Sequence, residues 1–165
     1  ELKPVHPHVL SLLARGENVE GVGRIGLRDL VRQALRMRPD RVIVGEVRGP
    51  EVIDLLLAMN TGHEGGAGTV HANSVAEVPA RLEALAALDG LERYALHSQL
   101  AGAIQVVVHL RRTRQVRQVA EIGVLTRGSN GLVIPATVFD DTGQPTDLAP
   151  LLAGLLTARS VAPPW

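Results

Sequence analysis

The sequence predicts a mixed α/β fold, in which a parallel α/β layer is followed by an antiparallel β extension. Two short expected strands, the β-branched run 41–44 and residues 67–71, are separated by one helix length, which is the spacing of neighbouring parallel strands. From residue 104 onwards the pattern changes to β-rich segments joined by short turns. The expected order is therefore α-β-α-β-α-α followed by β-β-β.

The first expected helix begins at Leu27 and ends before Pro39, because proline disfavours helical backbone in the residue before it. Its apolar positions follow i, i+3, i+4 spacing; they are Leu30, Val31, Ala34 and Leu35. Three arginines, Arg28, Arg32 and Arg36, share the opposite side. This arginine face is interpreted as solvated, and the alternative is that some of these arginines reach a nucleotide in this subunit or a neighbouring one.

Residues 41–44 form a β-branched run typical of a strand that is covered on both faces. Glu46 follows where such a strand leaves the sheet, and ligands bind at that edge of open α/β sheets. The next helix is expected from residues 49–51, with Pro50 in its first turn, to Asn60. Gly62 closes this helix.

The second strand, residues 67–71, leads into a helix with Ser74 and Glu77 at capping-box spacing. A further helix is expected over residues 91–103, where His97 and Gln99 are interpreted as surface polar groups. A hairpin is expected from residues 104–111 and 115–126 around a short basic link, 112–114. A third strand over residues 132–139 and a helix over 148–159 complete the chain.

Composition limits the classes of protein that the chain can represent. Its 165 residues fit one domain, with 45% apolar and 2% aromatic residues, so we expect an aliphatic core. Seventeen basic residues balance seventeen acidic ones, which provides no overall field to attract nucleic acid. There is no cysteine, which excludes disulfides and thiolate zinc sites. No apolar run is long enough to span a membrane, and we expect a cytoplasmic protein.

The chain begins without Met and contains no G-x-x-x-x-G-K-[ST] loop, the phosphate-cradling motif. We therefore expect it to be part of a longer protein, with that loop upstream.

Glu46 is the first candidate for chemistry. Hydrolysis of a phosphoanhydride needs a water that a fixed carboxylate orients and deprotonates, and the end of a buried strand suits that role. Gly45 occupies the place where an Asp often holds magnesium, so Mg²⁺ would be held by the missing loop, by waters or by an upstream acid such as Glu1. The alternative role for Glu46 is a salt bridge to Arg48 or Arg41.

The glycine-rich stretch after the second helix carries His63 and His71, with Thr69 and Asn73 as neutral donors. Glycine permits close approach to a ligand, and imidazole can donate to a phosphate oxygen. The structural alternatives are a core histidine for His71 and a helix-end cap for His63. A zinc hydrolase is disfavoured. Its H-E-x-x-H motif needs both imidazoles on one helix face, whereas here the spacing of the two histidines differs and glycine interrupts any helix.

The run LRDLVRQALRMRPDRVIVGEVRGPEVIDLLLAMNTGHEGGAGTVHANS closely resembles the secretion-ATPase superfamily of type II and type IV secretion. It looks most like the tight-adherence (Tad/Flp) pilus assembly ATPases. The resemblance implies a RecA-like P-loop NTPase core, of which this chain is the C-terminal portion without the Walker A part. It also implies ATP and Mg²⁺ as ligands, a hexameric ring, and a place at the cytoplasmic face of the membrane.

Carried over by position, RVIVGE matches the family's atypical Walker B motif and makes Glu46 the catalytic glutamate. Residues 62–73 match the His box, which implies that His63 and His71 sense or contact the nucleotide. Thr69 and Arg48 are further candidates for nucleotide binding or sensing. Glu1 matches the end of the acidic Asp box, and Arg15 matches an arginine that follows it. Ser11 stands where relatives often carry Arg, which removes one phosphate contact.

The function that this resemblance implies is part of an ATP-hydrolysing motor for Tad/Flp-type pilus assembly or type II/IV secretion. Two alternatives remain: a conjugative or type IV secretion traction ATPase, and, for this chain alone, an assembly module without hydrolysis. Without the Walker A loop we expect the chain alone to be inactive. Expected partners are further copies and inner-membrane pilus or secretion platform proteins, without direct nucleic-acid contact. The expected divisions are 1–28 (lead-in), 29–111 (α/β core), 112–147 (β-hairpin extension) and 148–165 (C-terminal helix and tail).

Overall fold

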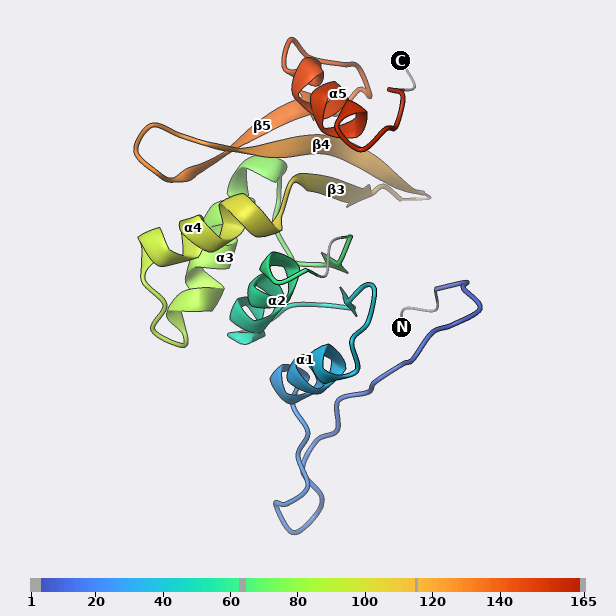
Figure 1. The fold of residues 1–165 in the computed structure, drawn as a ribbon, viewed down its shortest axis with the longest axis vertical. Helices are drawn as coiled ribbons and strands as arrows, with labels where there is room; N and C mark the ends of the chain where they lie inside the picture. The colour runs from blue at the N-terminus through green and yellow to red at the C-terminus, as the bar shows by residue number, and fades with distance from the viewer. Residues whose placement is uncertain (1–3, 63–64, 115, 164–165) are drawn as a thin grey trace.

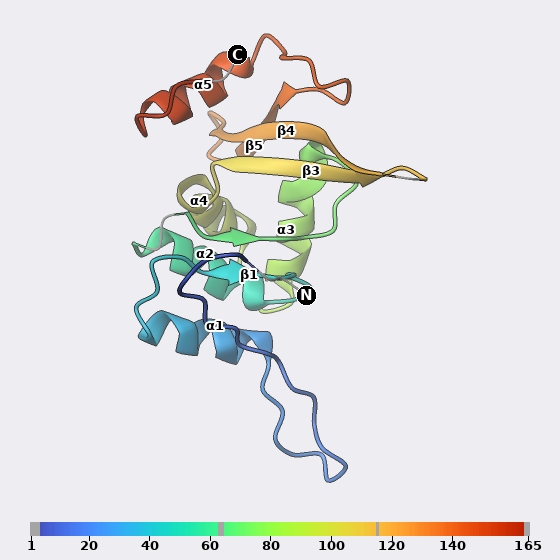
Figure 2. The same ribbon diagram turned by 90° about the vertical axis from the view of Figure 1, so that its right-hand side faces the viewer.

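Two β-sheets organise the computed structural model, which describes residues 4–62, 65–114 and 116–163. The first pairs β1 (Ile43–Val44) with β2 (Ala67–Gly68) in parallel. The second is antiparallel in the order β3 (Val106–Arg112), β4 (Arg117–Arg127) and β5 (Val133–Phe139). The predicted hairpin and third strand are confirmed, and in Figures 1 and 2 β2 lies between β1 and β3.

The helices surround these sheets in the predicted order. They are α1 (Leu27–Arg36), α2 (Glu51–Asn60), the 3₁₀ turn η1 (Val75–Glu77), α3 (Val78–Ala87), α4 (Arg93–Ala103) and α5 (Ala149–Thr157). Helices α3 and α4 lie on one side of the antiparallel sheet and α5 on the other, while α1 packs under α2 (Figures 1 and 2). No helix in the described ranges is long and apolar enough to cross a membrane.

Aliphatic side chains form the core, as the composition predicts. The larger cluster joins α2, α3 and α4 around Leu56, Leu96 and Leu100, which are almost completely buried. The smaller cluster lies between the antiparallel sheet and α5, where Val124 and Val138 contact Leu152. Leu125, the next residue of β4, packs in the larger cluster instead, because successive strand residues point to opposite faces. One strand thereby connects both clusters.

The arginine face of α1 is partly a structural clamp. Asp54 of α2 is buried, and its two carboxylate oxygens accept hydrogen bonds from Arg28 Nε at 2.6 Å and Arg32 Nε at 2.7 Å. Arg28 also reaches Asp89, after α3, at 2.7 Å. The solvated-face interpretation is therefore incomplete for Arg28 and Arg32, which stay partly exposed while they pair with Asp54. A buried carboxylate needs such partners, since burying it unpaired would be costly.

Burial also corrects the prediction for His97. This side chain is buried, its Nδ1 accepts the backbone N–H of Val133 at 2.7 Å, and its Nε2 lies 2.8 Å from Glu83 Oε1. Because Nδ1 acts as the acceptor, Nε2 carries the proton and donates to the carboxylate. His97 therefore ties together α3, α4 and β5 and is not a surface group. Gln99 accepts from Asn60 Nδ2 through its backbone and side-chain oxygens.

Three local predictions also change. The first strand is shorter than expected, and Ile43 is 49% exposed, so its cover on both faces is not present. Pro50 is the N-cap of α2 and lies before its first turn. Ser74 makes no capping hydrogen bond, and Glu77 instead accepts from the backbone and side-chain amides of Asn73.

Replacing Asp54 with Asn tests the clamp between α1 and α2. The amide keeps the shape but loses two charge-assisted hydrogen bonds, so we expect the free energy of unfolding to fall by about 1–3 kcal/mol. Chemical denaturation measures this difference. Arg36→Gln on the same helix, where the side chain is exposed, is the control and should change it by less than about 0.5 kcal/mol. Equal effects of both variants would show that the clamp does not stabilise the fold.

Candidate functional site

The parallel pairing of β1 and β2 brings two polar segments to one sheet edge. Ile43 is paired with Ala67 and Val44 with Gly68, so both strands end at the same side. Beyond that end, the backbone N–H of Val47 donates to the carbonyl of Thr69 at 2.8 Å. A Cβ on Gly68 would lie 2.8 Å from a Leu55 methyl, so glycine allows β2 to lie this close to α2.

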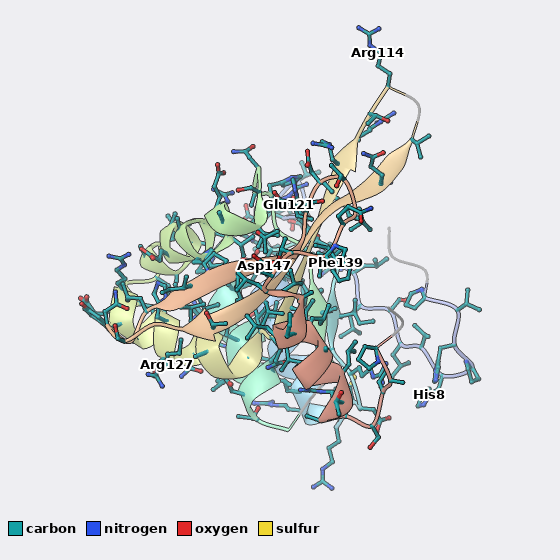
Figure 3. All side chains as sticks on the ribbon, turned by 90° about the horizontal axis from the view of Figure 1, so that it is seen from above. His8, Arg114, Glu121, Arg127, Phe139 and Asp147 are labelled. Atoms are coloured by element: carbon teal, nitrogen blue, oxygen red, sulfur yellow. The ribbon has the colours of Figure 1, made fainter. Side chains whose placement is uncertain are left out.

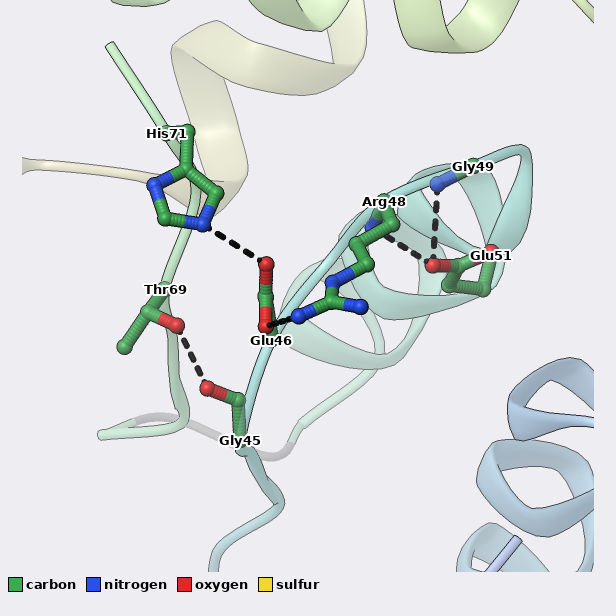
Figure 4. A network of polar contacts seen from close by, with 7 residues as sticks. All are labelled: Gly45, Glu46, Arg48, Gly49, Glu51, Thr69 and His71. Carbon is green, nitrogen blue, oxygen red and sulfur yellow. Dashed lines mark hydrogen bonds and ion pairs between the residues drawn. The ribbon is translucent and has the colours of Figure 1, made fainter. Parts of the chain in front are cut away.

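Glu46 is held between two cationic or polar side chains at this edge (Figure 4). Arg48 Nη2 donates to Glu46 Oε2 at 2.6 Å, and His71 Nε2 lies 2.8 Å from Oε1. The His71 contact has ion-pair distance, and Glu46 Oε1 has no hydrogen-bond partner that meets strict geometry within the described residues. The Glu46 side chain is 22% exposed, whereas those of Arg48 and His71 are 77% and 82% exposed. The carboxylate is thus fixed at the edge while its partners face solvent.

The surroundings keep Glu46 ionised. The hydrogen bond from Arg48 lowers the pKa of this carboxyl group below its ordinary value, although partial desolvation acts in the opposite direction. The charges of Arg48 and His71 lower the pKa further. An ionised carboxylate can accept a proton, which is the chemical requirement for a general base.

Glu51 shapes the turn that carries Arg48, and sequence reasoning missed this role. Its Oε1 accepts the backbone N–H groups of Arg48 at 2.7 Å and Gly49 at 3.0 Å (Figure 4). These are N–H groups at the start of α2, where a negative charge is favoured. The signal in the sequence was an acidic residue directly after Gly-Pro at a helix start.

The His-box residues fall into three situations. His71 is exposed beside Glu46, so the core-histidine alternative is wrong. The hydroxyl of Thr69 donates to the carbonyl of Gly45, which ties the exits of both strands together (Figure 4). His63 lies outside the described residues. A shallow hollow of about 520 Å³ adjoins this edge; its lining is His71, Ala72, Asn73, Glu77, Ala80 and Arg81.

The upstream candidate Arg15 makes its contacts away from Glu46. Arg15 belongs to the N-terminal arm, where its backbone pairs with Ile25 and its Nε donates to the carbonyl of Gly23 at 2.9 Å. Glu1 lies outside the described residues. Within the described residues, no group of three or more His, Asp or Glu side chains could hold a metal ion.

Comparisons with known proteins identify the family of the chain and agree with its mixed α/β fold. Residues 1–135 match the family described as "Type II/IV secretion system protein", and the chain belongs to this family. The structure of the VirB11 ATPase from the Brucella suis type IV secretion system is similar, with a TM-score of 0.56 and 26% identity. That likeness covers 61% of this chain and 32% of the VirB11 chain.

The curated relatives include conjugal transfer proteins. The chain is 60% identical over 163 residues to a putative conjugal transfer protein of Mycobacterium tuberculosis H37Rv, covering 98% of this chain and 46% of that protein. It is 36% identical over 107 residues to the probable conjugal transfer protein TrbB of Sinorhizobium fredii, covering 65% of this chain and 32% of TrbB. The chain thus spans about half of the length of the Mycobacterium tuberculosis relative and about a third of the length of TrbB.

Replacing Arg48 with Gln tests the electrostatics of the site. Loss of the guanidinium should raise the pKa of Glu46 toward its ordinary value, which side-chain ¹³C NMR across an acidic titration measures. In the unchanged protein the folded pKa lies below the unfolded one, so the Glu46 contribution to stability is present at neutral pH. That contribution is lost as the pH falls through the lowered pKa, and Arg48→Gln should remove this part of the pH dependence.

The matched control is Arg93→Gln, because Arg93 pairs with a different carboxylate, Glu83. It should leave the titration of Glu46 unchanged. An unchanged Glu46 titration in Arg48→Gln would contradict the assignment of Arg48 as the main cause.

Proposed function

We propose that the whole protein is an ATP-hydrolysing motor of conjugative or type IV secretion, and that Glu46 is its general base. The observation that carries this proposal is the ionised Glu46 carboxylate at the exit of β1, between Arg48 and His71. Phosphoanhydride hydrolysis needs a positioned base beside the attacking water and positive charge near the γ-phosphate. Glu46 supplies the first, and the two neighbouring side chains supply the second.

The contacts also suggest how nucleotide engages the site. Arg48 and His71 are mostly exposed, and both can turn toward an entering phosphate at little packing cost. A γ-phosphate competes with Glu46 for them, because its charge is larger and more concentrated. Their movement would free the Glu46 oxygens to accept a proton from water. In this proposal Arg48 and His71 contact phosphate, and Thr69 fixes the spacing between the two strand ends.

We extend the proposal to a RecA-like P-loop core completed by residues outside this chain. Strands β1 and β2 have only two residues each, and β2 and β3 belong to separate sheets although β2 lies toward β3 (Figures 1 and 2). A strand from elsewhere in the whole protein, placed between them, would join the two sheets. The Walker A loop, and with it Mg²⁺ binding, would then reach Glu46. Residues 29–111 form the core and 112–147 its extension in this arrangement.

The names of the relatives favour one of the two proposed classes of motor. Their names refer to conjugal transfer and type IV secretion, and this supports the conjugative alternative above the Tad/Flp pilus interpretation. Pilus assembly remains the second candidate because of the motif resemblance. A hexameric ring docked at the cytoplasmic face of the membrane, on platform proteins, is part of either proposal.

Glu46→Gln in the whole protein tests the base directly. The amide keeps the shape of the side chain but cannot accept the proton, so we expect turnover to fall about a hundredfold or more while ATP affinity stays similar. Steady-state phosphate release and equilibrium nucleotide binding measure the two quantities. Glu17→Gln, in the exposed N-terminal arm, is the control and should retain normal turnover. Turnover near normal in Glu46→Gln would remove Glu46 from the mechanism.

His71→Ala separates a nucleotide contact from a structural role. Because His71 is exposed, the free energy of unfolding should change by less than about 0.5 kcal/mol. Hydrolysis should fall about tenfold or more, since one phosphate donor is lost. Thermal denaturation and phosphate release on the same preparation give both numbers. A large loss of stability with a proportionate loss of activity would indicate that His71 acts through the fold.

A further inference from the structure

The hairpin of β3 and β4 continues beyond the three-stranded sheet as a narrow two-stranded ribbon. β5 pairs with β4 only from Ile122 to Arg127, whereas the β3–β4 pairing continues to Arg112 opposite Arg117. An irregularity between His109 and Leu110 marks where the ribbon leaves the sheet. We call residues 110–114 and 116–119 the ribbon tip. Figure 3 shows Arg114 at its far end, well away from the body of the molecule.

Positive charge is concentrated on the ribbon tip, although the chain as a whole has no net charge. The tip holds Arg111, Arg112, Arg114 and Arg117 and no acidic residue. Arg112 and Arg117 are direct cross-strand partners, and like charges in that position destabilise a hairpin. Arg111 lies 3.6 Å from Asp141, and the contacts within the described residues give the other three no acidic partner. This arrangement favours an external anion.

Apolar side chains are interleaved with these arginines. Leu110 is paired with Val119 across the ribbon, on the same face as the Arg112–Arg117 pair, because cross-strand partners share a face. Leu110 is 63% exposed and Val119 is 53% exposed. Val116, near the turn, is exposed as well. One solvent-exposed face of the ribbon therefore carries aliphatic side chains next to its arginines.

We propose that the ribbon tip docks on the surface of a bilayer that contains anionic phospholipid. Arginine binds phosphate headgroups, while neighbouring aliphatic side chains enter the boundary between headgroups and acyl chains. Because the ribbon projects from the body of the molecule, a broad lipid surface can reach its tip without meeting the rest of the chain. Nucleic acid fits less well, because the residues of the tip include no aromatic side chain that could stack on bases. This docking is independent of Glu46 chemistry.

The test is co-sedimentation of the purified protein with vesicles of phosphatidylcholine alone or with phosphatidylglycerol added. The unchanged protein should bind the anionic vesicles, bind neutral ones weakly, and release as salt rises. The double variant Arg112→Gln/Arg117→Gln should weaken binding to anionic vesicles roughly tenfold or more. Leu110→Asn should weaken it too and leave the salt dependence in place. Arg114→Gln, a single change near the turn, gives the same readout if the double variant does not fold.

The matched control is Arg24→Gln/Arg127→Gln, which removes the same charge from exposed positions outside the ribbon tip. It should bind like the unchanged protein. Equal losses in both double variants, equal binding to neutral vesicles, or displacement of the vesicles by short duplex DNA would each overturn the proposal. ATP turnover without membranes should be unaffected by Arg112→Gln/Arg117→Gln, so failure of lipid docking and failure of the ATPase proposal remain distinguishable.

Discussion

The parallel pairing of β1 with β2 is the constraint on which the site depends. It is only two residue pairs long, yet it brings the segments after both strands to one edge, with Val47 bonded to Thr69 and Thr69 to Gly45. Glu46 and His71 meet because of this register. A shift by one residue would turn either side chain to the other face of the sheet. The short pair is in turn supported by α2, whose Leu55 packs directly over Gly68.

Helix α2 connects the site to the remainder of the fold. At its start, Glu51 fixes the turn that carries Arg48; in its middle, Asp54 anchors α1; at its end, Asn60 bonds to Gln99 of α4. The apolar side of the same helix fills the larger core cluster. A displacement of α1 or α4 that moves α2 would therefore also move the turn that carries Arg48, which contacts Glu46.

The sequence was sufficient for features that depend on local pattern. Element order, the hairpin, and the position of Glu46 just after a strand follow from periodicity and from residues adjacent in the chain. The clamp on Asp54 and the buried His97 were not predictable in this way, because their partners lie 14 to 36 residues away. An aspartate or histidine on a helix gives no local sign of which distant donor or acceptor will face it. Short strands were likewise overestimated, since their length depends on neighbours that pattern alone does not identify.

The central claim is that Glu46 faces the γ-phosphate of ATP. The most direct measurement is a structure of the whole protein with Mg²⁺ and a non-hydrolysable ATP analogue. We predict that the γ-phosphate lies one water molecule away from the Glu46 carboxylate, with Arg48 or His71 turned from Glu46 toward the phosphate. A nucleotide bound elsewhere, with the Glu46–Arg48 contact unchanged and no room for water between Glu46 and phosphate, would contradict the claim.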